Sequence, residues 1–246
     1  MRSRTLWREY LPGYHDTHAG ITEALLRRCS EDPYRWLLNG EHTIGDRVMD
    51  LACGSAPLFD QLQQARYLGV DASGPELRLA AARGAEPLVQ ADATCLPLPD
   101  SSFDVVVCSM ALQVLTPLPM VLAELARVLR PQGRLIAMLP VSGPLTAGDR
   151  LRYARVLRRL RRLRLGYANP HPLHALRSSG WTIHSRQSRR FGYPINAPED
   201  GQRLIDAFYL PGSTAQRQAS AAALAGRWTG LEIGIPLQRI IATPPA

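Results

Sequence analysis

The sequence predicts an α/β fold built on a parallel, doubly wound sheet. Short apolar segments rich in β-branched residues alternate with helical segments between residues 47 and 139, which is the pattern of a sheet with helical crossovers. A turn of small residues follows the first of these strands, and aspartates stand at or just after the ends of the first three. Because right-handed crossovers bring the carboxyl ends of parallel strands to one edge, these residues are expected to meet there.

Each element of this central part has a local reason. Residues 103–109 are apolar and β-branched, as in a strand buried on both faces. Pro75 suits the first turn of a helix, and the leucines of residues 118–129 recur at helical spacing before Pro131 and Gly133. The strands are expected at residues 47–51, 67–70, 87–90, 103–109 and 134–139, and the helices at residues 58–64, 75–83 and 118–129.

The two ends of the chain have a different pattern. Apolar residues are periodic over residues 17–26 and gather again at 34–38, so we expect a helical cap over residues 1–40. Residues 41–246 are expected to form the ligand-binding domain. Its later part is expected to contain a helix over 149–165, strands over 181–190 and 232–242, and helices around 203–210 and 215–228. The insertion at about 194–230 is interpreted as a lid or a dimerisation element, which leaves a homodimer possible.

The helix expected over residues 149–165 is rich in arginine. Tyr153, Leu157 and Leu160 form an apolar stripe at helical spacing, which leaves the arginines mostly on the solvent side. A solvated face is the first interpretation. The alternative is binding of an acidic substrate, a carrier protein or RNA, since guanidinium groups suit phosphates and carboxylates. The arginines are Arg152, Arg155, Arg158, Arg159, Arg161, Arg162 and Arg164.

Composition sets limits on the class of protein. The formal net charge is +8 and the chain contains no lysine, a bias typical of GC-rich genomes. The cysteines form no CxxC pair, so we expect neither a metal site nor a disulfide framework. No apolar stretch approaches the ~20 residues of a membrane span, and residues 1–10 are not typical of a signal peptide. We expect a cytoplasmic protein without a membrane partner.

The most informative segment is residues 48–92. The first strand ends in Asp50 and is followed by the turn ACGSA, the second strand ends in Asp71, and Asp92 follows the third. A turn of small residues lets the backbone come close to a ligand, and a carboxylate at the end of the next strand can accept two ribose hydroxyls. The turn has no basic residue, unlike a phosphate-binding loop of the GxxxxGK[ST] type. The segment therefore predicts a nucleoside site.

Four stretches carry a further signal: VMDLACGSA, YLGVDAS, ADATCLPLPDSSFDVVVCSMALQVL and LARVLRPQGRLIAMLP. Together, over about residues 45–141, they resemble the class I S-adenosylmethionine (SAM)-dependent methyltransferases of the methyltransferase type 11 kind. The resemblance implies a Rossmann-like sheet of seven mostly parallel strands, with one antiparallel strand inserted beside the fifth. It also implies SAM as the cofactor and S-adenosylhomocysteine as the product.

The resemblance further implies which residues bind the cofactor. Asp71 matches the residue that holds the ribose, and Asp92 the one that contacts the adenine amino group. The full set is Asp50, Ala52, Gly54, Asp71, Ala72, Asp92, Ala93, Ser109 and Met110. The turn departs from the family pattern, because Ala52 and Ala56 stand where glycines are usual, and alanine disfavours positive φ. Ala56 is also expected to narrow the space for the methionine part of SAM.

The resemblance places the substrate above the methyl group, beneath the cap and the late insertion. The expected substrate-binding residues are Trp7, Tyr10, Tyr14, Gln113, Tyr193 and Asn196. Aromatic rings there can enclose a sulfonium, although the first interpretation is that they pack the cap onto the core. The candidate catalytic residues are His15, Tyr14, Gln113 and Tyr193.

The function expected from this resemblance is methyl transfer from SAM to a small molecule, in specialised metabolism, with alignment of the reactants as the main contribution of the protein. One alternative is a cyclase that converts SAM itself into azetidine-2-carboxylate and releases methylthioadenosine. Another is an RNA-binding or RNA-modifying protein that uses the arginine-rich helix. A nucleic-acid partner is disfavoured, since the chain contains no catalytic tetrapeptide such as DPPY or NPPF.

Overall fold

The computed structural model describes residues 2–41 and 45–245, and its centre is one mixed sheet. The order of its seven strands is β3-β2-β1-β4-β5-β7-β6. Strands β1 to β5 are parallel, and β7 pairs antiparallel with both β5 and β6. The expected antiparallel strand beside the fifth is confirmed. The strands are β1 (Arg47–Leu51), β2 (Arg66–Asp71), β3 (Leu88–Gln90), β4 (Phe103–Ser109), β5 (Leu129–Pro140), β6 (Thr182–Ile195) and β7 (Leu231–Thr243).

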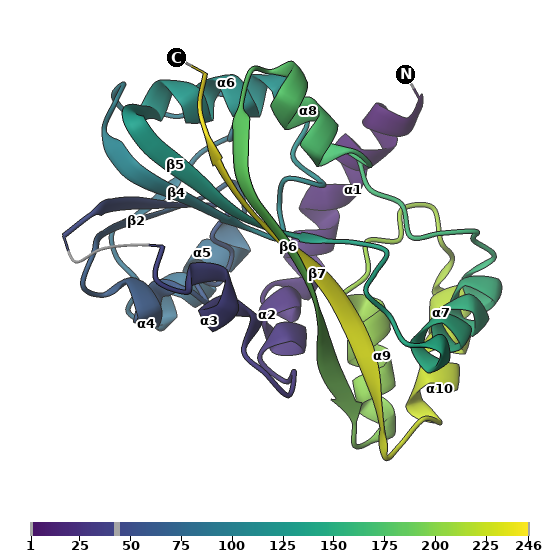
Figure 1. Ribbon diagram of the computed structural model, residues 1–246. Helices are drawn as coiled ribbons and strands as arrows, with labels where there is room; N and C mark the ends of the chain where they lie inside the picture. The colour runs from purple at the N-terminus through teal and green to yellow at the C-terminus, as the bar shows by residue number, and fades with distance from the viewer. Residues whose placement is uncertain (1, 42–44, 246) are drawn as a thin grey trace.

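Helices cover and connect these strands. Helices α7, α9 and α10 gather around the far half of the long β6–β7 hairpin, while α6 and α8 lie near its other end (Figure 1). None of the helices within the described ranges is long and apolar enough to cross a membrane. The helices are α1 (Arg2–His18), α2 (Ile21–Leu26), α3 (Pro33–Leu38), α4 (Phe59–Leu62), α5 (Gly74–Ala82), α6 (Leu118–Val128), α7 (Ala147–Leu160), α8 (Pro172–Ser178), α9 (Pro198–Asp206) and α10 (Ala215–Gly226).

Both faces of the sheet are buried, because successive side chains of β4 point to opposite faces. Val105 and Val107 join one apolar cluster with side chains of α2, α3, α9 and α10. Val106 and Cys108 join a second cluster with side chains of α6 and α8. All four residues are 0% exposed. The continuous apolar sequence of this strand is therefore explained by burial on both sides, and the sheet forms a rigid base for its carboxyl edge.

The segment before the sheet folds into three helices. The sequence predicts one helix over residues 17–26, but the chain breaks at Gly20, whose φ is 75°, a conformation that glycine adopts at little cost. The Gly20 N–H donates to both carboxylate oxygens of Glu76, at 3.1 and 3.0 Å. Helix α1, which lies within the helical cap expected over residues 1–40, therefore ends against α5 and lies over the carboxyl edge of the sheet.

The segment after β5 differs from expectation in its boundaries. Helix α7 ends at Leu160, five residues early, because Arg161 has a left-handed φ of 53°. Strand β6 is longer than expected, since it stays paired with β7 as far as Ile195. Helix α9 begins before the expected 203–210, where the Asp200 carboxylate accepts from two preceding N–H groups. Helix α8 was not expected. The proposed domain limits and the homodimer stay predictions.

One buried carboxylate ties α7 to the β6–β7 hairpin. Asp149 is 0% exposed, and it accepts from Arg190 Nε at 2.7 Å, from the Gly234 N–H at 2.9 Å and from Thr146 Oγ1 at 2.7 Å. Burial opposes its ionisation, but these donors outweigh burial and hold the pKa of Asp149 well below its ordinary value. The Asp149–Arg190 ion pair therefore holds the start of α7 against the β6–β7 hairpin.

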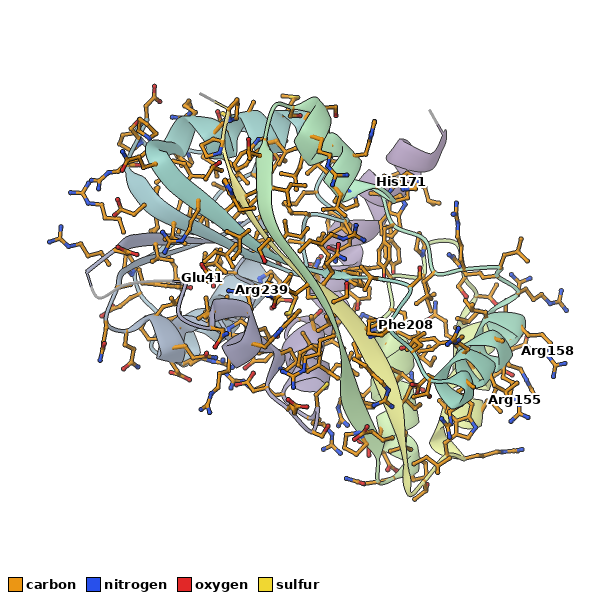
Figure 2. The ribbon with its side chains drawn as sticks, viewed as in Figure 1. Glu41, Arg155, Arg158, His171, Phe208 and Arg239 are labelled. Atoms are coloured by element: carbon orange, nitrogen blue, oxygen red, sulfur yellow. The ribbon has the colours of Figure 1, made fainter. Side chains whose placement is uncertain are left out.

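A second buried ion pair joins the N-terminal helices to the centre of the sheet. Arg239 of β7 is 4% exposed; its Nη2 lies 2.9 Å from Glu41 Oε1, and its Nε donates to the Leu37 carbonyl at 2.8 Å. Figure 2 shows Glu41 and Arg239 side by side near the middle of the sheet. The end of α3 is thus held on the strand that lies between β5 and β6.

Asp149→Ala is expected to lower the free energy of unfolding by about 3 to 5 kcal/mol, because it leaves the Arg190 charge without its buried partner. Since the pKa of Asp149 is depressed in the folded state, the difference from wild type should be full above about pH 4, the unfolded value, and shrink as the pH falls further. Urea denaturation at several pH values measures it. As control, Asp100→Ala removes a 75% exposed carboxylate and should change stability by less than about 0.5 kcal/mol.

Candidate functional site

A first cavity of about 590 Å³ opens at the carboxyl edge of the parallel strands. Its walls are the turns after β1 and β2, the residues after β3 and β4, and part of α1. The edge of the sheet therefore brings together most residues that the sequence singled out. The predicted cofactor-binding residues in its lining are Asp50, Ala52, Gly54, Asp71, Ala72, Ala93, Ser109 and Met110.

The turn after β1 bends sharply around three left-handed residues. Ala52, Gly54 and Ala56 have φ values of 53°, 55° and 55°. This conformation costs an alanine roughly 1–2 kcal/mol, so the two alanines keep the bend that glycine would adopt freely. Ala56 does not narrow the cavity as expected; it is 0% exposed and packs against Ala80 and Ala85 behind the turn.

Asp71 holds the bend and the start of α5 together. Its Oδ2 accepts from the Gly54 N–H at 2.8 Å, and its Oδ1 accepts from the Ser73 N–H at 2.8 Å. Burial raises the pKa of Asp71, while these two backbone donors oppose the shift. Each carboxylate oxygen keeps a free lone pair. The group can therefore accept two further hydroxyls from a ligand in the first cavity.

Asp50 is a buried carboxyl group that faces the same cavity. It is 1% exposed; the Tyr67 hydroxyl donates to its Oδ2 at 3.3 Å, whereas its Oδ1 has no hydrogen-bond partner among the described residues. Burial raises the pKa of Asp50 to about 8, the Tyr67 hydrogen bond opposes this, and the nearby Asp71 charge adds to it. A buried carboxyl with a free oxygen suits a ligand that carries positive charge or a donor.

Asp92 is the one predicted cofactor residue outside the lining. Its neighbours Ala91 and Ala93 line the cavity, but the Asp92 carboxylate is exposed and accepts from the Thr94 N–H and hydroxyl at 2.8 and 2.7 Å. In this geometry it closes a turn. Its contact with adenine stays a prediction.

Glu76, which was not among the residues expected at the site, lines the first cavity and is 6% exposed. Its carboxylate accepts from the Gly20 N–H and lies 3.2 Å from His15 Nδ1. His15 also lines this cavity. Glu76 therefore holds α1 over the cavity, and the signal for it was an acidic residue in the first turn of α5. His15, a candidate base, is engaged with this carboxylate.

A second cavity of about 1440 Å³ adjoins the first. Thr22, Met110 and Tyr209 line both. Met110 follows β4 with a left-handed φ of 58° and donates its N–H to the Met138 carbonyl at 2.8 Å. Two of the expected substrate residues, Trp7 and Gln113, line the second cavity. The residue after β4 thus contributes to the walls of both cavities.

Gln113 lines the second cavity, and its side chain is buried. The side chain is 2% exposed, and its Nε2 donates to the Met110 carbonyl at 2.5 Å. Its backbone carbonyl accepts from the Asn169 N–H at 2.8 Å. The Oε1 atom has no partner within the described part of the chain. Because a buried polar atom without a partner is costly, this oxygen suits a donor group of a ligand.

Tyr10 and Tyr14 line neither cavity. The Tyr14 hydroxyl donates to the Asp206 carbonyl at 2.6 Å, and the Tyr10 hydroxyl accepts from the Leu210 N–H at 3.0 Å. Burial raises the pKa of both phenols, so neither serves as a base near neutral pH. The two residues attach α1 to the loop after α9, which is the packing interpretation given to them above.

Tyr193 and Asn196 also lie outside both cavities, contrary to their expected place beside the substrate. Pro140, the last residue of β5, pairs with Leu237 of β7, which pairs with Arg189 of β6. Tyr193 comes four residues after Arg189, so it lies beyond the end of the parallel strands. It is 0% exposed, and its hydroxyl donates to the Asp200 carbonyl at 3.1 Å. Asn196 is exposed at the start of α9. The length of β6 carries both residues away from the site.

Comparisons with known proteins identify a family model that part of the chain matches. Residues 49–137 match the family model for a methyltransferase domain. A demethylmenaquinone methyltransferase of Thermus thermophilus is 38% identical over 101 residues, which are 37% of this chain and 46% of that protein. The chain thus matches less than half the length of this curated relative.

Two solved structures share the fold. The YcgJ protein of Bacillus subtilis aligns with a TM-score of 0.57 and 19% identity, over 86% of this chain and 97% of that one. The [4+2]-cyclase SpnF aligns with a TM-score of 0.57 and 20% identity, over 87% and 80%. Residues 49–137, which contain the bend after β1, Asp71 and strand β4, thus match the model of the methyltransferase domain family.

Proposed function

We propose that the protein transfers the methyl group of SAM to a small-molecule acceptor, with SAM in the first cavity and the acceptor in the second. The observation that carries this proposal is that the two cavities share Thr22, Met110 and Tyr209. A donor and an acceptor bound in adjoining spaces can meet at their junction. The match to a demethylmenaquinone methyltransferase supports a biosynthetic reaction on a small molecule.

The first cavity fits SAM by the chemistry of its walls. Asp71 can accept the ribose hydroxyls, the bend at Gly54 lets the ligand approach the backbone, and the free oxygen of Asp50 suits its positively charged part. Bound SAM supplies a methyl group on a sulfonium. In the transfer, the acceptor atom forms a bond to the methyl carbon, the carbon–sulfur bond breaks with its electrons going to sulfur, and the acceptor loses a proton.

Alignment is the main contribution that these residues can make. Holding two reactants in line can contribute ~7–11 kcal/mol. Of the residues that line both cavities, Tyr209 carries an ionisable group, and burial raises its pKa, so it remains a donor. His15 lines the first cavity and contacts Glu76. Gln113 Oε1 can accept a hydrogen bond from the acceptor and orient it.

The large second cavity favours an external acceptor over cyclisation of SAM. Incubation with SAM alone tests this choice. Methyl transfer predicts no turnover until an acceptor is added and then S-adenosylhomocysteine in amounts equal to the methylated product. Release of methylthioadenosine from SAM alone would contradict the proposal and favour the cyclase.

Asp71→Asn is expected to weaken SAM binding at least tenfold, about 1.4 kcal/mol, since hydrogen bonds to a charged group contribute about 1.5–3 kcal/mol each. Isothermal titration calorimetry with SAM and with S-adenosylhomocysteine measures the change. Asp60→Asn, which alters a 61% exposed carboxylate, is the matched control and should leave both affinities unchanged. Equal affinity in wild type and Asp71→Asn would refute the assignment of the first cavity.

Asp50→Asn is expected to stabilise the ligand-free protein more at pH 8.5 than at pH 5. The pKa of Asp50 is about 8 in the folded protein and about 3.9 when unfolded. The folded state therefore binds the extra proton, and wild type loses stability as the pH rises from about 4 through 8. Urea denaturation at the two pH values measures the difference between the proteins.

The same Asp50→Asn protein should bind SAM about tenfold more weakly at pH 8.5, because it lacks the negative charge that faces the cation. Asp60→Asn again serves as the control, with a stability difference that stays constant between the two pH values. A pH-independent difference for Asp50→Asn would show that this carboxyl does not titrate in the expected range.

Gln113→Leu is expected to lower kcat/KM for the acceptor at least about tenfold, because it removes the oxygen that orients the acceptor. The affinity for SAM should change less than about twofold. Gln113→Glu, which restores an acceptor oxygen, should recover part of the activity. Methyl transfer from radiolabelled SAM measures these changes, and Gln187→Leu, at an exposed position of β6 outside both cavities, is the control. A matched loss of SAM affinity would argue against a positioning role.

A further inference from the structure

The charged residues that line the second cavity are all basic. Within the described part of the chain its lining contains no aspartate or glutamate. The basic residues are Arg162, Arg164, Arg177, Arg186, His171 and His174. The chain carries 21 acidic residues in all, so their absence from this wall gives the cavity a local excess of positive charge. A cavity of one sign concentrates ligands of the opposite sign.

These four arginines have no carboxylate partner among the residues that the structure describes. Some arginines elsewhere do: Arg190 pairs with Asp149 and Glu232, and Arg127 pairs with Glu124 and Asp100. The Arg162 guanidinium donates to the Pro211 carbonyl, which leaves its charge uncompensated. Free guanidinium groups beside an apolar space are suited to bind a carboxylate, sulfate or phosphate.

The remaining wall of the second cavity is mostly apolar. Leu25, Leu139, Leu157, Phe208 and Ile235 contribute to it, and Phe208 is partly buried against the apolar cluster that contains Ile235. Such walls hold an aromatic or aliphatic body by removing it from water. The cavity thus combines an apolar interior with cationic groups.

The far side of the cavity is a row of residues across three strands. Leu139 of β5 pairs with Gln238 of β7, which pairs with Ser188 of β6, and the Gln238 Nε2 donates to Ser188 Oγ at 2.8 Å. Paired residues point to the same face of a sheet, and Arg186 lies two residues before Ser188 on that face. The strand thus presents an arginine beside the apolar wall.

We propose that the second cavity takes a small amphipathic acceptor with an apolar body and an anionic group, which the cavity arginines bind. The inference rests on the proposed function for the role of this ligand as acceptor, but its binding can be measured without SAM. It also separates two sets of arginines, because Arg155 and Arg158 point outward from α7 and do not line the cavity (Figure 2).

A matched pair of fluorescent probes tests the charge requirement. 8-Anilinonaphthalene-1-sulfonate and N-phenyl-1-naphthylamine share one apolar body and differ by the sulfonate. Wild type should bind the sulfonate probe at one site. Its affinity for this probe should be at least about tenfold higher than for the uncharged probe, equivalent to about 1.4 kcal/mol. Equal affinity for the two probes would overturn the proposal.

Two double variants with the same change in charge locate the anion site. Arg164→Glu/Arg177→Glu reverses the charge of two exposed cavity arginines. It should lower the affinity for the sulfonate probe at least tenfold and change the affinity for the uncharged probe by less than about twofold. Arg155→Glu/Arg158→Glu reverses two exposed arginines outside the cavity and should leave both probes unchanged. Equal losses in both double variants would mean a general surface effect and would overturn the proposal.

A cavity-filling variant shows where the probes sit. Ser188→Trp, at an exposed strand position that lines the cavity, should weaken both probes at least tenfold, while far-UV circular dichroism stays unchanged. Unaltered binding of both probes would place them elsewhere and overturn the assignment.

Two further measurements separate this inference from its alternatives. Calorimetry with SAM on the same proteins shows which of the two proposals fails. If SAM binds but the two probes bind equally well, this inference alone is overturned. If the sulfonate probe is preferred but SAM does not bind, the proposed function alone is overturned. A single-stranded RNA 20-mer that binds wild type with strong salt dependence, and loses affinity in Arg155→Glu/Arg158→Glu, would overturn the small-molecule assignment in favour of RNA.

Discussion

The carboxylate of Asp71 is the contact on which the first cavity depends. It joins the turn after β1 to the start of α5, through one hydrogen bond to each. Parallel strands place those two segments at the same edge of the sheet, but they leave the distance between them open. The carboxylate sets that distance and keeps the bend at Gly54 against the strain of its neighbours Ala52 and Ala56. One side chain therefore shapes the wall of the cavity and offers its remaining lone pairs to the ligand.

The opposite balance holds for Asp50. A group whose ionisation is resisted by burial weakens the folded protein once it carries charge. Such a group can be retained where a bound cation offsets the cost of ionising it, since carboxyl groups with a strongly raised pKa are characteristic of functional sites. The two acids therefore differ. Each oxygen of Asp71 accepts a backbone hydrogen bond in the ligand-free protein, whereas Asp50 Oδ1 has no hydrogen-bond partner among the described residues.

Sequence alone predicted the central sheet and most of the first cavity, because both follow from local patterns. The strand at Phe103–Ser109 and the aspartate at the end of β2 are visible in the order of residues. Helix α1 lies within the expected helical cap, but its limits were not predicted, because its polar residues obscure the helical spacing of Trp7, Tyr10 and Tyr14.

Other features depend on contacts between distant residues. The break at Gly20 is fixed by Glu76, 56 positions away. The position of Tyr193 is set by how far β6 and β7 stay paired, which no local pattern reveals. Arg161 takes a left-handed conformation without being glycine, so the early end of α7 carried no signal.

The division between the two cavities has an evolutionary consequence. The family match ends at residue 137, and of the described residues lining the second cavity only Met110 and Gln113 fall within the matched span. Most residues that line the first cavity, the proposed donor site, lie within this span, whereas the β6–β7 hairpin and helices α7 to α10 lie beyond it. Descendants of such a scaffold can exchange one acceptor for another by remodelling the β6–β7 arm, without disturbing the residues that face the donor.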